Sequence, residues 1–183
     1  MMHENFERRF KGQPVSPGIA MGRLRVEARG STAPLVRTIL PTEIESEWQR
    51  FEAALNCTET EIQELRARVE SLSGASEAAI FDAHLLFLRD RMILNRLRKE
   101  MPLRLQNIDS VYYAVVQNFM EAMRQVDDAY LRSRVADIGD VLQRVLKNLD
   151  QGGVKTRKNK PVSQEPCLLA AYDLAPSDTA DLD

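Results

Sequence analysis

The fold of this chain is decided by residues 43–74, which read EIESEWQRFEAALNCTETEIQELRARVESLSG. Apolar side chains recur there in steps of three and four, with one gap at Thr58: Ile44, Trp48, Phe51, Leu55, Ile62, Leu65, Val69 and Leu72. This spacing predicts a long amphipathic helix whose narrow apolar seam packs along another helix. Thr42 and Glu45 predict a capping box at its start, and Gly74 predicts its end.

Three more helical segments are predicted after this one. The first begins near Ser76, and the charged residues 89–91 predict a break in it before Pro102, which either ends this run or starts the next. The second is predicted to begin at Asp109, a good capping residue, and the third covers residues 131–149. Helices joined by such short connections predict a mostly antiparallel, four-helix-type bundle.

The two ends of the chain differ in composition from the helical part. Residues 19–26 alternate in polarity, which predicts a strand, and residues 167–171 form a short apolar run that fits a buried strand. We therefore expect a split α/β domain with the bundle inserted in it, so that the chain is mainly α and of the α+β class overall. The expected division is residues 1–40 and 151–183 for the α/β domain, incomplete here, and residues 41–150 for the helical domain.

Composition excludes several classes of function. The formal net charge is −2 over 183 residues, so no large field of one sign favours nucleic acid or an anionic membrane as a partner. Cys57 and Cys167 lie far apart without the spacing of metal ligands, so no metal site is expected. No apolar run reaches the length of a membrane span, and the charged residues 1–10 are not a signal peptide. We expect a soluble, cytoplasmic protein.

Three segments carry a family signature: VSPGIAMG at residues 15–22, AIFDAHLLFL at residues 79–88, and YLRSRVADI at residues 130–138 followed by LLAAYDLAPSDTA at residues 168–180. Their order and spacing are similar to those of Enzyme I, the phosphoenolpyruvate–protein phosphotransferase of the bacterial sugar phosphotransferase system. The resemblance implies a swivelling phosphohistidine α/β domain with an inserted helical domain that docks the phosphocarrier protein HPr. It also implies that the intact enzyme uses phosphoenolpyruvate and Mg²⁺ and dimerises through a carboxy-terminal barrel.

The phosphate-accepting histidine of that family stands in a Gly-Gly-x-Thr-Ser-His motif, which this sequence lacks. The resemblance implies that this histidine lies beyond Asp183. We therefore expect an amino-terminal portion truncated before the motif, inactive and monomeric by itself, with no catalytic residue and no cofactor of its own. One alternative is a stand-alone, non-catalytic helical adaptor or degenerate remnant. Another is a paralogue that serves a nitrogen-regulatory carrier.

The resemblance also implies which residues dock HPr, paired with the helix around residues 112–119: Ala79, Asp82, Ala83, His84, Leu86, Phe87, Asp90, Arg91 and Arg134. The alternatives are a satisfied core or rim position for His84 and a solvated helical position for Arg134. Relatives carry carboxylates on both sides of this helix, where this chain has Ala75, Ser76, Arg89 and Arg91. Because charges at the rim of an interface steer encounter, this departure predicts slower association with a basic carrier.

Overall fold

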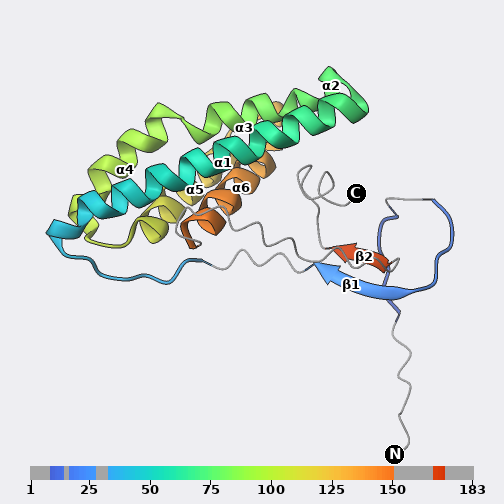
Figure 1. Cartoon of the computed structure of the whole chain (residues 1–183), viewed down its shortest axis with the longest axis horizontal. Helices are drawn as coiled ribbons and strands as arrows, with labels where there is room; N and C mark the ends of the chain where they lie inside the picture. Colours follow the sequence, from blue (N-terminus) through green and yellow to red (C-terminus); the bar gives the residue numbers. More distant parts are fainter. Residues whose placement is uncertain (1–8, 15–16, 28–32, 151–166, 172–183) are drawn as a thin grey trace, which may run out of the picture.

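The computed structural model describes residues 9–14, 17–27, 33–150 and 167–171 (Figure 1). The elements in chain order are β1 (Arg23–Glu27), the 3₁₀ turn η1 (Pro41–Glu43), α1 (Ile44–Ser73), α2 (Ala75–Ala78), α3 (Ile80–Leu88), α4 (Arg91–Arg104), α5 (Ile108–Gln125), α6 (Ala129–Asp150) and β2 (Cys167–Ala171). Figure 1 shows the helices side by side in an elongated bundle with α1 along its whole length, and the two strands beside it. The predicted class, a helical bundle within an α+β chain, is confirmed.

The two strands come from opposite ends of the chain and pair in parallel. Arg23 is opposite Cys167, and the register continues to Glu27 opposite Ala171. Parallel strands need a crossover connection, and here all the helices that the structure describes lie within it. The strand predicted at residues 19–26 begins later than expected, at Arg23, which is where the pairing with Cys167 begins. The domain limits at residues 40 and 150 remain a prediction.

The start of the first helix differs from the predicted capping box of Thr42 and Glu45. The chain enters through η1, where Pro41 supplies the fixed φ that suits a first helical position. The Glu43 carboxylate accepts a hydrogen bond from the Leu40 N–H at 2.7 Å, and the Glu43 N–H donates to the Leu40 carbonyl at 2.9 Å. The carboxylate that closes this turn is therefore Glu43. At the other end, Gly74 stops α1 as predicted, with φ 104°.

The predicted break at residues 89–91 is confirmed. The Asp90 carboxylate caps α4 by accepting hydrogen bonds from the N–H groups of Met92 at 2.9 Å and Ile93 at 3.0 Å. This capping ends α3 at Leu88 and lets a separate helix begin.

Two predicted helix boundaries are wrong. Pro102 lies within α4, which ends instead at Arg104 and is followed by the cap residue Leu105 in the left-handed conformation. Asp109 lies in the first turn of α5, whose cap position is Asn107. Its carboxylate still stabilises that helix start, because negative charge near a helix amino terminus is favourable, and it also pairs with Arg50 of α1.

The helices share one hydrophobic core. The seam predicted for the first helix faces it: Phe51, Leu55, Ile62 and Leu65 are buried, whereas Leu72 near the end of α1 is exposed. Phe51 packs on Tyr112 of α5 with ring centroids 5.1 Å apart. The apolar faces of α4, α5 and α6 complete this core with Leu97, Val111, Val115, Leu142 and Val145. Burial of this kind contributes most of the stability of a helical domain.

A buried polar network ties the segment before η1 to the bundle. Glu47 of α1 is 6% exposed. It accepts hydrogen bonds from Arg37 at 2.9 Å, from Arg50 at 2.9 Å and from the Ile108 N–H at 2.7 Å. One carboxylate therefore holds the entering chain, α1 and the start of α5 together.

The backbone and the side chain of Asn107 add further hydrogen bonds between the bundle and the segment before η1. The Arg37 N–H donates to Asn107 Oδ1 at 2.8 Å, and the Asn107 N–H donates to the Arg37 carbonyl at 2.9 Å. The Asn107 side-chain amide also donates to the Leu35 carbonyl at 3.2 Å. These bonds seat residues 35–40 against the α4–α5 connection.

Replacing Glu47 with Ala is predicted to destabilise the bundle by about 2–3 kcal/mol, because hydrogen bonds to a charged group are strong and the Ile108 N–H is left buried without its acceptor. Urea unfolding measures this loss as a lower midpoint with an unchanged slope. The matched control is Glu45→Ala on the exposed side of the same helix turn, expected to cost less than about 0.5 kcal/mol. Equal effects of the two substitutions would contradict the role given to Glu47.

Candidate functional site

An open, mainly apolar groove lies between α3, α5 and α6, with a cavity volume of about 280 Å³. We call it the α3–α6 groove. Its lining consists of Ala83, His84, Leu86, Phe87 and Asp90 from α3 and the cap that follows, Phe119 and Met123 from α5, and Arg134, Asp137 and Ile138 from α6. A concave apolar surface with a few polar groups is the usual form of a binding site.

The structure brings together most of the residues that the sequence predicted for docking. Those that line the α3–α6 groove are Ala83, His84, Leu86, Phe87, Asp90 and Arg134. Ala79, Asp82 and Arg91 do not line it. Ala79 and Arg91 are exposed at the two ends of α3, and the Asp82 carboxylate faces α1, where it accepts from Arg66 Nε at 2.7 Å.

The catalytic prediction concerns a different part of the protein. It placed the phosphate-accepting histidine beyond Asp183, and Asp183 itself lies outside the described residues, which end at Ala171. The position of that histidine therefore stays a prediction.

Sequence reasoning missed Met123, Asp137 and Ile138 as site residues. Met123 and Ile138 belong to apolar helix faces in the sequence, where a groove wall and a core position have the same spacing. Asp137 stands three residues after Arg134, a spacing that places both side chains on one helix face. That spacing was the available signal.

The apolar side chains along the wall of the groove differ in their exposure to solvent. Phe87 is half-buried and its ring lies 5.9 Å from that of Phe119, tilted by 39°. Leu86 beside it is 78% exposed. An exposed large apolar side chain next to a half-buried aromatic pair is typical of a surface that another molecule covers.

His84 forms the floor of the groove and is 1% exposed. Its ring packs edge-on against Phe81, with centroids 5.6 Å apart. Nε2 lies 3.7 Å from Asp137 Oδ1 and Nδ1 lies 3.9 Å from Asp140 Oδ2. Within the described part of the chain neither ring nitrogen has a hydrogen-bond partner. Burial lowers the pKa of His84 below 6.5, and the two carboxylates oppose that shift only in part.

Arg134 and Arg144 each lie against one of these carboxylates. Arg134 at the groove donates to Asp137 Oδ2 at 3.1 Å. Arg144, deeper in the bundle, lies 3.5 Å from Asp140 and 3.8 Å from Glu61 of α1. The carboxylates on both sides of His84 are therefore each held by an arginine of the same helix.

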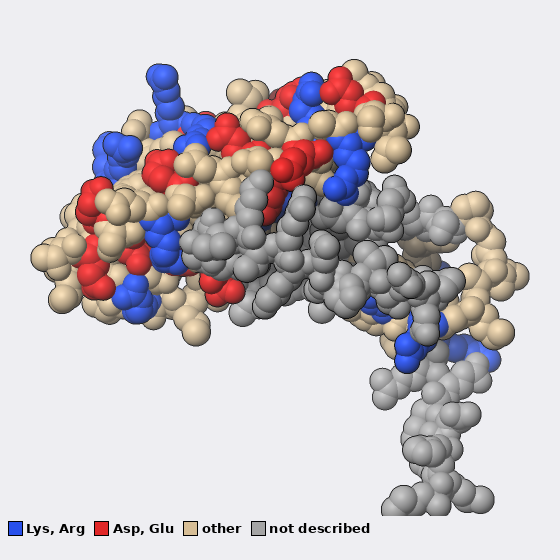
Figure 2. Space-filling model, viewed as in Figure 1, with Lys and Arg blue, Asp and Glu red and all other residues tan. Residues whose placement is uncertain are grey.

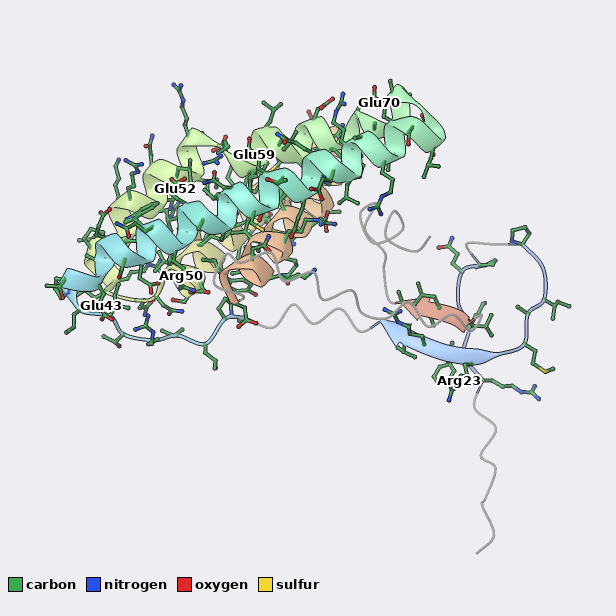
Figure 3. All side chains as sticks on the ribbon, viewed as in Figure 1. Arg23, Glu43, Arg50, Glu52, Glu59 and Glu70 are labelled. Carbon is green, nitrogen blue, oxygen red and sulfur yellow. The ribbon has the colours of Figure 1, made fainter. Side chains whose placement is uncertain are left out.

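The two basic residues Arg89 and Arg91, where the resemblance leads one to expect carboxylates, differ in their surroundings. Arg89 turns toward α1, where it bonds Glu52 at 3.1 Å and Glu59 at 2.9 Å, and Figure 3 shows these two glutamates in succession along α1. Arg91 is exposed beyond the cap of α4. The Arg89 charge is therefore paired with carboxylates of α1, whereas Arg91 is exposed to solvent outside the groove lining.

Figure 2 shows acidic and basic side chains interspersed over the visible face of the bundle. No single-sign field covers that face. Among the described residues, no group of three or more His, Cys, Asp and Glu side chains is arranged to hold a metal ion. The described helices also include none that is both long enough and apolar enough to cross a membrane.

Comparison with known proteins places this geometry in a family. The family model described as the N-terminal domain of PEP-utilising enzymes matches residues 11–134. The chain belongs to this family. Among curated proteins, the phosphoenolpyruvate-protein phosphotransferases of Listeria innocua and Priestia megaterium are each 34% identical to it, over 94% of this chain and 29% of their own length. The chain thus spans less than a third of these PEP-utilising relatives.

Solved structures of PEP-utilising relatives have a similar fold. A solution structure of Enzyme I covers 90% of this chain and 65% of its own, with a TM-score of 0.70 and 29% identity. The N-terminal domain of Enzyme 1 - Nitrogen covers 91% of this chain and 66% of its own, with a TM-score of 0.63 and 23% identity, and so shares the fold. The resemblance to Enzyme I predicted from the sequence is confirmed.

The buried His84 is predicted to make the bundle less stable in acid. Its pKa is below 6.5 in the folded chain, so as the pH falls through 6.5 the unfolded chain binds a proton that the folded chain does not. The free energy of unfolding then falls, by at most about 1.4 kcal/mol per pH unit from this one group, until the folded His84 also titrates.

Urea unfolding of the wild type and of His84→Gln over this pH range checks the prediction. The other titrating groups are common to both proteins, so the difference between the two curves isolates His84. That difference should shrink as the pH falls below 6.5. A constant difference would contradict the prediction.

Proposed function

We propose that this chain is the carrier-recognition part of a phosphoenolpyruvate–protein phosphotransferase, and that the α3–α6 groove docks an HPr-type phosphocarrier protein. The observation that carries the proposal is the position of the groove. It lies on residues 83–90 and on Arg134, within the segments whose resemblance to Enzyme I implies carrier docking. The membership of the chain in the PEP-utilising family supports the same assignment.

The character of the groove suits a transient protein partner. Leu86 at its mouth and the pair of Phe87 and Phe119 offer an apolar anchor point, and Arg134 offers a directed charge beside it. Interfaces that must form and separate at each turnover are small, with a few apolar anchors and a polar rim. A cavity of about 280 Å³ accommodates one or two side chains of the carrier.

In this proposal the described part of the chain contributes recognition and leaves the phosphate chemistry to other parts of the whole enzyme. A phosphate-accepting histidine needs an accessible ring nitrogen as its nucleophile. His84 is 1% exposed and lies between two carboxylates that repel a phosphate. His3, the other histidine of the sequence, is outside the described residues. We therefore propose that the chain by itself does not accept phosphate, and that the accepting histidine of the whole enzyme follows Asp183.

The proposal extends to the whole enzyme, with its phosphotransferase activity supported by the names of its relatives and its other properties by the sequence resemblance to Enzyme I. It would use phosphoenolpyruvate with Mg²⁺, work in the cytoplasm as a homodimer, and phosphorylate HPr for sugar uptake. The described residues offer no cluster fit for Mg²⁺, so the metal is proposed to bind to other parts of the enzyme. Dimer contacts and the phosphoenolpyruvate site are likewise proposed for other parts of the enzyme, with this chain monomeric by itself.

Replacing Leu86 with Asp is predicted to weaken the binding of purified HPr about ten-fold or more, because a carboxylate would take the place of the apolar side chain at the centre of the contact. Leu86 is a cleaner choice than Phe87, whose half-buried ring packs on Phe119. Isothermal titration of the chain with HPr measures the change in affinity.

The matched control is Leu103→Asp. Leu103 is 83% exposed on α4 and does not line the groove, so this substitution should leave both affinity and thermal stability unchanged. If Leu86→Asp binds HPr as tightly as Leu103→Asp does, docking takes place on another surface.

A further inference from the structure

A line of alternating charges runs under the α3–α6 groove. It begins with Arg134 at the groove and passes through Asp137, His84 and Asp140 to Arg144. The separations are 3.1, 3.7, 3.9 and 3.5 Å in that order. Four of these residues belong to α6, and His84 alone reaches into the line from α3. A neutral His84 leaves an uncharged position between Asp137 and Asp140, whereas a protonated His84 places a positive charge between these two carboxylates.

The neutral imidazole fits this position poorly. It has one N–H donor and one acceptor nitrogen, whereas a carboxylate only accepts. With Asp137 facing Nε2 and Asp140 facing Nδ1, one ring nitrogen of the neutral form always meets a group that cannot donate to it. The imidazolium has two N–H groups and could donate to both carboxylates. Burial favours the neutral form and the neighbours favour the charged one, so a small change in surroundings can move the balance.

In the part of the chain that the structure describes, the charged groups facing the ring come from α6, with Glu61 of α1 behind Arg144. Asp137, Asp140, Arg134 and Arg144 belong to α6, and Glu61 of α1 lies 3.8 Å from Arg144. On the α5 side the groove is lined by Phe119 and Met123, which do not titrate. Asp82 on α3 is engaged with Arg66 of α1.

Asp137 links the ring to the groove surface, because its two carboxylate oxygens have different neighbours. Oδ2 accepts from Arg134 at 3.1 Å, whereas Oδ1 faces His84 Nε2 at 3.7 Å, beyond a normal hydrogen bond. A proton gained from solvent by His84 would give Oδ1 a charged donor and draw the carboxylate toward the ring. The hold of Asp137 on the Arg134 guanidinium would then weaken.

We propose that His84 is a proton-linked positioning residue of the groove: when it is protonated, Asp137 moves its main contact from Arg134 to the imidazolium, and Arg134 turns to an acceptor oxygen of the docked partner. The identity of that partner as an HPr-type carrier rests on the proposed function. By linkage, docking and protonation favour each other to the same extent. Partner binding therefore makes His84 easier to protonate, and mild acid strengthens binding.

The first test needs no partner. Nuclear magnetic resonance of the whole chain follows the His84 ring and the Arg134 Nε–Hε signal from about pH 8 to about pH 5. The proposal expects both signals to shift with one midpoint, and expects Asp137→Asn to abolish the shift of Arg134. The Arg96 signal is the internal control, because Arg96 pairs with Glu100 on α4, outside the groove lining.

Two results of this test would overturn the proposal. One is a His84 that titrates while the Arg134 signal stays still. The other is a His84 that stays neutral until the bundle unfolds. Both come from the wild-type chain, so neither depends on a variant that fails to fold.

The second test uses purified HPr at a series of pH values. Wild-type affinity should rise about five-fold on mild acidification, a typical size for coupling between two sites, and His84→Gln should remove that rise while HPr's own titration remains. If HPr affinity has the same pH dependence in the two proteins, the proposed role of His84 is contradicted but the proposed function is not. An absence of HPr binding at every pH would contradict the proposed function and leave the first test standing.

Discussion

The packing of His84 of α3 into α6 is the contact on which the site depends. Because the His84 side chain points into the bundle, the helical period also places Phe81, three residues earlier, and Leu88, four residues later, in the core. The same period turns Leu86 out to solvent and leaves Phe87 at the edge. The carboxylate of Asp90 then ends α3 by starting a new helix. The groove is thus the space between a short helix held at its middle and the longer helices on which it lies.

The opposite end of α1 carries a different kind of constraint. There Glu47 and Asn107 hold the chain that precedes η1, through hydrogen bonds that are buried or partly buried. Figure 1 shows that this end of the bundle lies away from α2 and α3, which follow the far end of α1. A substitution in one region should therefore leave the other region intact, since distant sites without shared partners act independently.

Local patterns predicted much of the fold. The apolar seam of α1, the stop at Gly74, the break before Arg91 and the two short strands each depend on neighbours in the sequence, and each was predicted. The start of α1 and the cap of α5 were predicted one to three residues from their true positions, because Thr42, Glu45 and Asp109 are capping residue types that lie close to the residues in use. Pro102 was assigned to a helix boundary although α4 continues for two residues beyond it.

Only the part of the site that depends on local sequence was predicted. Residues 83–87 form one turn of helix, and a resemblance over that turn placed them together. Met123, Asp137 and Ile138 reach the groove only through the packing of α5 and α6 on α3, which no local spacing reveals. The unsatisfied nitrogens of His84 likewise required the positions of Asp137 and Asp140, which lie more than fifty residues further along the sequence.

Docking of a carrier in the α3–α6 groove is tested most directly by chemical-shift mapping of the labelled chain titrated with unlabelled HPr. We expect the largest amide shifts on the end of α3, the end of α5 and the first half of α6, around Leu86, Met123 and Arg134. Shifts concentrated instead on the exposed face of α4 around Arg98 and Leu103, with the groove unaffected, would contradict docking in this groove.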